Sequence, residues 1–175
     1  ELLVRACNQI KYKHIVYDKW GMSKRILYGR GLSMLFTGPP GTGKTMAAQV
    51  VASDLDLEVY RVDLSKVISK YIGESEKNLS EVFDSAKKSN AVLLFDETDA
   101  LFGKRTEVKD SHDKHANVET SYLLQKMEEY SGITIMTTNF IENIDKAFFR
   151  RINYVVHFNL PDFDLRLKIW KNMFP

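Results

Sequence analysis

A glycine-rich stretch, GPPGTGKT at residues 38–45, holds side chains suited to binding phosphate. Its glycines allow a tight turn in which backbone N–H groups point inward and no Cβ obstructs an anion. Lys44 can reach the β- and γ-phosphate oxygens, and the Thr45 hydroxyl can ligate Mg²⁺. An apolar run at 32–36 precedes the stretch, and an Ala- and Val-rich segment at 46–55 follows it. Because a phosphate-binding loop requires this strand–loop–helix order, the stretch predicts a nucleoside triphosphate site.

The start of the following helix adds to this predicted site. A helix that begins near Gly43 or Lys44 contributes unpaired N–H donors and the positive end of its dipole. We therefore expect the nucleotide to contact both the loop and the first helical turn. The residues concerned are Gly38, Pro39, Pro40, Gly41, Thr42, Gly43, Lys44, Thr45 and Met46.

Two carboxylates follow a second apolar run. Residues 91–95 are continuously apolar, as is typical of a central parallel strand covered on both faces, and Asp96 and Glu97 come next. Ligands of open α/β sheets bind at the carboxyl ends of the strands. Asp96 can hold Mg²⁺, and Glu97 can polarise the water that attacks the γ-phosphate. An acidic pair can also serve only as a helix cap, but its combination with the loop at 38–45 favours the catalytic role.

The elements that must position these groups alternate along the chain. Apolar runs and helical spacing predict strands at 32–36, 58–63, 91–95, 133–137 and 154–158, and helices at 2–10, 46–55, 79–86, 118–130, 143–149 and from 161 onward. The alternation predicts an α/β fold with a mostly parallel sheet and helices on both faces. Residues 103–117 are polar and charged, which predicts a solvated loop.

The segment at 14–31 has no clear period and leaves two interpretations open. Because it leads up to the phosphate-binding strand, Tyr17, Asp18 or Gly21 could cover the nucleotide base. Alternatively, its aromatic residues, Tyr17 and Trp20, pack on the sheet.

Composition narrows the class of protein. The 175 residues suffice for a single α/β domain, and a net charge of +2 is too near neutral to argue for nucleic acid or an anionic membrane. The single cysteine, Cys7, fits a reducing compartment, so we expect a cytoplasmic protein. No apolar run approaches the roughly 20 residues of a membrane span. Glu1 is not a natural start and the chain stops abruptly at Pro175, so we expect an excised domain.

Four motifs together give a resemblance to AAA-type (AAA+) ATPases, specifically to their large nucleotide-binding subdomain, from about residue 14 to the end. The motifs are the Walker A loop at 38–45, the Walker B strand at 93–97, the sensor 1 residue Asn139 and the arginine fingers Arg150 and Arg151. The segments at 70–78 and 101–105 look most like those of bacterial single-module AAA proteins.

The resemblance implies an architecture and a set of roles. The fold would be a P-loop NTPase three-layer sandwich with strand order 5-1-4-3-2. The large subdomain would span 1–161, with 1–31 as a lead-in helix and loop, and 162–175 would begin a truncated helical lid. The catalytic residues would be Lys44, Glu97, Asn139, Arg150 and Arg151, with ATP as nucleotide and Thr45 and Asp96 holding Mg²⁺.

The family also implies an assembly, a homo-hexameric ring that hydrolyses ATP at subunit interfaces. Tyr71 and Ile72 match the pore-loop position that grips polypeptide in threading members. Arg150 and Arg151 would reach a neighbour's γ-phosphate, although their adjacency, without the Pro-Gly spacer of many relatives, leaves open which is the principal finger. Thr98 stands where many members have Ala, a change that should be tolerated.

Three functions use a phosphate-binding loop like the one at 38–45. The first is an ATP-driven enzyme that remodels, unfolds or disassembles a protein substrate. The second is a nucleotide-switched nucleic-acid machine of the clamp-loader or initiator type, and the third is a small-molecule kinase. The near-neutral net charge and the loop at 71–73 favour the protein-remodelling enzyme. We therefore expect a protein substrate and neither a membrane nor a nucleic acid as partner. A kinase has no need of a water-activating Glu97 and ranks last.

Overall fold

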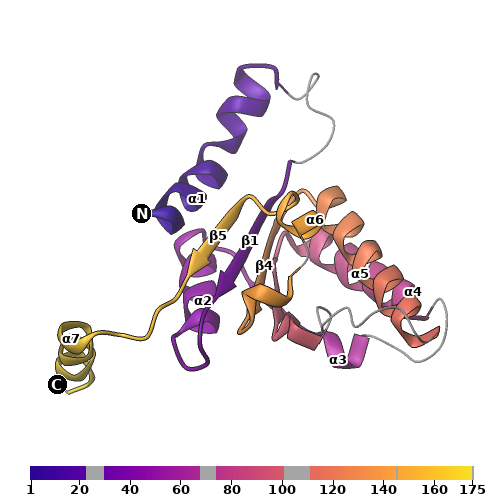
Figure 1. Cartoon of the computed structure of the whole chain (residues 1–175). Helices are drawn as coiled ribbons and strands as arrows, with labels where there is room; N and C mark the ends of the chain where they lie inside the picture. Colours follow the sequence, from indigo (N-terminus) through magenta and orange to yellow (C-terminus); the bar gives the residue numbers. More distant parts are fainter. Residues whose placement is uncertain (23–29, 68–73, 101–110, 145, 175) are drawn as a thin grey trace.

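The computed structural model describes residues 1–22, 30–67, 74–100, 111–144 and 146–174. Within them a single parallel sheet has the strand order β2-β3-β4-β1-β5 (Figure 1). The strands are β1 (Leu32–Thr37), β2 (Val59–Asp63), β3 (Val92–Asp96), β4 (Ile133–Thr138) and β5 (Tyr154–His157). Counted from the opposite edge, this is the predicted order 5-1-4-3-2, so the predicted fold class is confirmed.

The register brings the carboxyl ends of neighbouring strands together. Thr37, the last residue of β1, pairs with Thr138, the last residue of β4. In the same way Asp63 at the end of β2 pairs with Asp96 at the end of β3. Groups that follow these strands therefore meet at one edge of the sheet, where ligands bind in open α/β folds.

Helices cover both faces of the sheet. Helices α1 and α2 pack on one face, and α4 and α5 pack on the other (Figure 1). The helical elements are α1 (Leu2–Lys11), the π-helix η1 (Ile15–Lys19), α2 (Lys44–Asp54), α3 (Leu64–Val67), α4 (Glu74–Ser89), η3 (Thr98–Ala100), α5 (Ser111–Glu129), η4 (Ile141–Asn143), α6 (Lys146–Phe149) and α7 (Phe163–Met173). None of the described helices is both long enough and apolar enough to cross a lipid bilayer.

The position of β3 between two helical layers explains why residues 91–95 are continuously apolar. Val92 and Leu94 belong to the core beneath α1 and α2, whereas Leu93 and Phe95 belong to the core beneath α4 and α5. All four side chains are buried because successive residues of a strand point to opposite faces, and both faces are covered. The strand is thereby fixed rigidly just before its two carboxylates.

Helices α4 and α5 both begin before the starts that their apolar spacing predicts. Helix α4 begins at Glu74, ahead of the predicted range 79–86, and Asn90 follows it with φ of 53°, the left-handed conformation that commonly terminates a helix. Helix α5 begins at Ser111, whereas its apolar period predicts a start at Val118 and a loop up to Asn117. The loop prediction is wrong for residues 111–117 because polar sequence indicates exposure to solvent, which a helix turn tolerates as well as a loop does.

Helix α7 lies apart from the body of the molecule. It starts after Pro161 as predicted, with Asp162 Oδ1 accepting a hydrogen bond from the backbone N–H of Leu165 (2.8 Å). Its residues are all exposed, and Figure 1 shows the helix at the end of an extended segment after β5. The sheet and its two helical layers therefore form the core without it.

Candidate active site

The glycine-rich stretch forms the loop between β1 and α2, here called the phosphate loop (38–45). Gly38 has φ of 144° and Gly41 has φ of 76°, values that L-residues with a side chain rarely adopt. A Cβ on Gly38 would also lie 2.0 Å from the carbonyl oxygen of Phe158. Helix α2 begins at Lys44, as the sequence predicts. Glycine is thus favoured at both positions for conformation, and at Gly38 it is also required for close packing.

The Lys44 ammonium holds this loop against the end of β4. Its Nζ donates hydrogen bonds to the carbonyl oxygens of Gly38 (2.6 Å) and Pro39 (2.9 Å) and to Oδ1 of Asn139 (2.9 Å). Only 8% of the residue is exposed. The structure therefore brings together two residues, Lys44 and Asn139, that lie far apart in the sequence.

Burial and nearby carboxylates act on the pKa of Lys44 in opposite directions. Burial, the larger influence, lowers the pKa below the ordinary lysine value. The negative charges of Asp99 and Asp96 raise it. The two carboxylates thus favour the charged form of Lys44, which is the form that attracts phosphate.

The Asp96 carboxylate lies at the centre of a polar cluster. It accepts hydrogen bonds from Thr45 Oγ1 (3.3 Å to each oxygen) and Thr137 Oγ1 (2.6 Å), and it forms an ion pair with Arg61 Nη2 (2.8 Å). The carboxylate of Asp96 and the hydroxyl of Thr45 are hard oxygen donors of the kind that Mg²⁺ prefers, so the donor set fits this ion. Neither Thr137 nor Arg61 was predicted to belong to the site.

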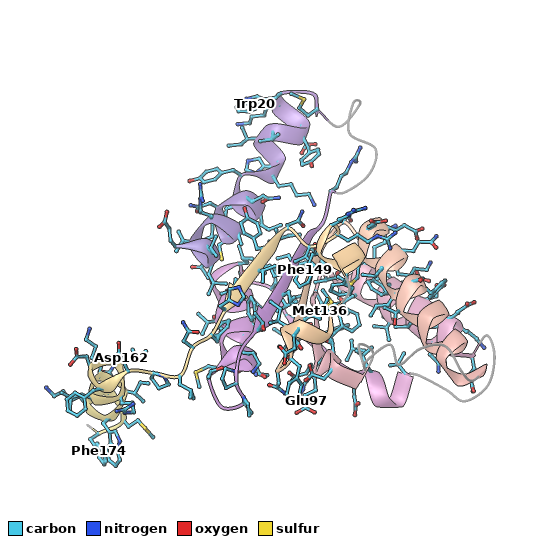
Figure 2. All side chains as sticks on the ribbon, in the orientation of Figure 1. Trp20, Glu97, Met136, Phe149, Asp162 and Phe174 are labelled. Carbon is cyan, nitrogen blue, oxygen red and sulfur yellow. The ribbon has the colours of Figure 1, made fainter. Side chains whose placement is uncertain are left out.

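Glu97 has an unusual backbone conformation. Its φ is 53°, and its N–H donates to Thr137 Oγ1 (3.0 Å). For a residue other than glycine this conformation costs on the order of 1–3 kcal/mol, and such strain is typical of active sites. The side chain is exposed at the carboxyl edge of the sheet (Figure 2). A carboxylate is therefore available there to a water molecule beside the phosphate loop.

Asp99 is a further carboxylate that the sequence did not single out. It lies in η3, and its Oδ2 accepts a hydrogen bond from Nδ2 of Asn139 (3.1 Å). An acid three positions after Asp96 gives only a weak signal, because a turn acid after a strand is common.

The two arginines lie near the other end of the sheet. Arg151 Nε pairs with Glu128 Oε1 (2.9 Å), and the Arg151 carbonyl accepts a hydrogen bond from the hydroxyl of Ser33 (2.7 Å). Ser33 is near the start of β1, whereas Lys44 comes after its end. At roughly 3.3 Å per residue, the strand separates these arginines from their own phosphate loop by more than about 10 Å. Arg150 is exposed.

The lead-in segment lies away from the phosphate loop. Tyr17 and Asp18 line a cavity of about 540 Å³ together with Gly132 and Ile133, at the start of β4. In Figure 2, Trp20 and Glu97 occupy opposite ends of the molecule. Tyr17 and Asp18 therefore lie beside the start of β4, and the interpretation that this segment covers the base stays a prediction. The aperiodic stretch continues α1 as a π-helix.

The predicted pore-loop residues, Tyr71 and Ile72, lie outside the described residues, as does the segment at 101–105. Their roles stay predictions.

Comparison with known proteins identifies the family. Residues 34–160 match the model of the "ATPase family associated with various cellular activities (AAA)". An uncharacterized AAA family ATPase, y4kL of Sinorhizobium fredii, is 37% identical over 129 residues, which cover 74% of this chain and 39% of that protein. The proteasome-activating nucleotidase of Methanoregula boonei is 38% identical over 145 residues, covering 79% of this chain and 33% of that protein.

The chain belongs to the AAA ATPase family. A solved structure agrees: the FIGL-1 AAA domain in complex with ADP has a TM-score of 0.63 and 28% sequence identity, covering 81% of this chain and 47% of that one. The resemblance drawn from the sequence is confirmed, and ATP is the nucleotide that membership implies. This AAA domain spans 39% or less of the length of the two curated relatives.

The packing at Gly38 gives a first prediction for this AAA domain. We expect Gly38→Ala to lower the free energy of unfolding by roughly 2–4 kcal/mol, because the new Cβ meets the carbonyl of Phe158 and the backbone φ is unfavourable. Gly41→Ala is the matched control: its φ is 76°, but nothing lies within 4 Å of its Cβ, so only about 1–2 kcal/mol should be lost. Urea unfolding measures both, and equal losses would contradict the packing argument.

Proposed function

We propose that this AAA domain hydrolyses Mg²⁺-bound ATP at the phosphate loop and that hydrolysis drives the remodelling, unfolding or disassembly of a protein substrate. One observation carries the catalytic half of the proposal. Lys44 contacts Asn139, and Thr45 contacts Asp96, so the loop joins the ends of β3 and β4 through direct hydrogen bonds. Phosphoryl transfer needs such groups around one phosphate, because its catalysis is largely positioning and charge stabilisation.

Each residue of this constellation has a chemical task in the proposal. Lys44 supplies positive charge to the phosphate oxygens. Thr45 and Asp96 hold the metal ion, which when bound neutralises charge on the β- and γ-phosphates. Glu97 orients a water molecule and accepts its proton as the water oxygen bonds to the γ-phosphorus and the bond to ADP breaks.

Assembly into a ring of like subunits, a hexamer, completes the proposed site. Charge spreads over the oxygens of the phosphoryl group in transfer, and a guanidinium supplied in trans stabilises it. The backbone carbonyl of Arg151 accepts a hydrogen bond from Ser33 near the start of β1, distant from Lys44, and this position supports action on a neighbour's nucleotide. Arg150, exposed beside it, is available to the same neighbour.

The proposed substrate is a polypeptide. One relative is named for activating the proteasome, and another, from Caenorhabditis elegans, is named as a probable 26S proteasome regulatory subunit at 35% identity over 144 residues. These names support a protein substrate here. In this proposal Tyr71 and Ile72 grip the polypeptide as it passes through the ring.

Glu97→Gln should separate nucleotide binding from chemistry. The amide has the size of the carboxylate and can hydrogen-bond water, but it cannot accept a proton. In the full-length protein we expect ATP and Mg²⁺ to bind with near wild-type affinity by calorimetry, while phosphate release falls by about 10²-fold or more. Glu58→Gln, an exposed residue before β2, is the matched control and should keep wild-type turnover.

The same variant tests the class of substrate. Held in its ATP-bound state, full-length Glu97→Gln protein should retain its substrate during purification, and we expect mass spectrometry to find polypeptide. Retention of DNA or RNA in place of polypeptide would favour a nucleic-acid machine. Turnover within a few-fold of wild type would instead place the general base elsewhere.

A further inference from the structure

Asp99 is a carboxylate beside the site whose charge raises the pKa of Lys44 but which has no task in the proposed hydrolysis step. It accepts hydrogen bonds from the hydroxyl of Thr138, from the backbone N–H of Asn139 (3.1 Å to each carboxylate oxygen) and from Nδ2 of Asn139 (3.1 Å). These donors belong to two consecutive residues at the end of β4. One carboxylate from the turn after β3 therefore holds both the backbone and the side chain of Asn139.

This contact fixes which end of the Asn139 amide faces the phosphate loop. Nδ2 donates to Asp99, and Oδ1 accepts from Lys44 Nζ (2.9 Å). Rotating the amide by half a turn would direct its oxygen at a carboxylate and its NH₂ group at an ammonium, so both contacts would become repulsive. With Asp99 in place, Asn139 presents a hydrogen-bond acceptor to the site.

The turn that carries Asp99 is held by other contacts as well. The buried hydroxyl of Thr98 donates to the carbonyl of Thr137 (2.9 Å), and the N–H of Glu97 donates to Thr137 Oγ1 (3.0 Å). Neither contact involves the carboxylate of Asp99. Apart from the charge that Asp99 places near Lys44, the loss of that carboxylate should therefore act on Thr138 and Asn139.

We propose that Asp99 is a positioning residue for ATP hydrolysis. By binding Nδ2 of Asn139, it directs the Asn139 oxygen toward the phosphate loop, where that oxygen accepts a hydrogen bond from the attacking water. Glu97 takes the proton of this water, and Asn139 fixes its direction of approach. The inference rests on the proposed function, because it assigns Asp99 to the hydrolysis step at the same site.

The contact between Asp99 and Asn139 can be tested by NMR, without measuring ATP hydrolysis. In the ¹⁵N-labelled chain, the side-chain NH₂ signals of Asn139 should be well resolved and protected from solvent exchange, because Nδ2 donates to Asp99. Asp99→Ala should remove that protection. Thr98→Ala is the matched control, since it deletes a buried hydrogen bond of the same turn without touching Asn139, and the protection should remain. Unchanged protection in Asp99→Ala would overturn the inference.

The catalytic part is tested in the full-length protein. Asp99→Ala should lower kcat by about 10- to 100-fold, the range for partners that orient a functional side chain, with ATP affinity near wild type. Asp99→Asn, whose amide can still accept from Asn139, should lose less, and Thr98→Ala should keep nearly wild-type kcat. An equal loss in Thr98→Ala would mean that Asp99 only stabilises the turn, which overturns the proposal.

A double-variant cycle shows whether Asp99 acts through Asn139. If it does, the variant carrying both Asp99→Ala and Asn139→Ala should have the kcat of Asn139→Ala alone. Independent, multiplicative losses would overturn the positioning role. The two proposals fail separately: no release of phosphate from Mg²⁺ and ATP by the wild-type full-length protein refutes the proposed hydrolysis, whereas unchanged Asn139 protection refutes only the role of Asp99.

Discussion

Lys44→Ala is expected to abolish nucleotide binding while the domain stays folded. The Lys44 amine contacts two carbonyl oxygens of the phosphate loop and the Asn139 amide, and it belongs to neither apolar core cluster. Its removal therefore deletes a charge that binds phosphate without opening a cavity in the core. We expect calorimetry to show ATP affinity weakened by at least about 100-fold, as for the loss of one partner of a buried charge pair.

The matched control for this variant is Lys11→Ala. Lys11 is exposed and pairs with Asp54 (2.8 Å), so its loss removes the same charge from a distant surface. ATP affinity should stay at the wild-type value, and both variants should unfold cooperatively on heating. Wild-type ATP affinity in Lys44→Ala would refute the phosphate-loop assignment.

The sheet could be predicted from sequence because its signals are local. The largely apolar stretches that became β1, β3 and β4 are long enough to identify covered strands, and glycines placed the phosphate loop between β1 and α2. The strand order was not read from these runs. It came from the resemblance to AAA ATPases, because apolar pattern alone does not say which strands are neighbours.

The site residues that could not be predicted from the sequence are brought together by the pairing of neighbouring strands. Arg61 reaches Asp96 only because β2 lies beside β3 in a particular register. Thr137 contacts Asp96, and Asp99 contacts Asn139, only because β3 and β4 end side by side. In the sequence these residues are isolated polar groups 35 to 41 positions from their partners, and each has an ordinary turn or strand role that is more common.

The double variant Arg150→Ala with Arg151→Ala should bind ATP nearly as well as the wild type but hydrolyse it much more slowly. Arg151 pairs with Glu128, and neither arginine is hydrogen-bonded to the described part of the phosphate loop. ATP affinity in the full-length protein should therefore be nearly unchanged. Hydrolysis should fall by about 10³-fold or more, as when a guanidinium is withdrawn from the transferring phosphoryl group. Single variants should show which arginine contributes more.

Mixing two inactive proteins tests whether these arginines act between subunits. The double finger variant retains an intact phosphate loop, and Lys44→Ala retains intact arginines. In a ring with head-to-tail interfaces, equal mixing places an intact loop next to intact arginines at about a quarter of the interfaces. Turnover should thus rise from near zero to about a quarter of the wild-type value at equal proportions and decline on either side. If co-assembly is demonstrated and no mixing ratio restores turnover, the arginines do not complete a neighbour's site, since an interface site must recover wherever the two intact halves meet.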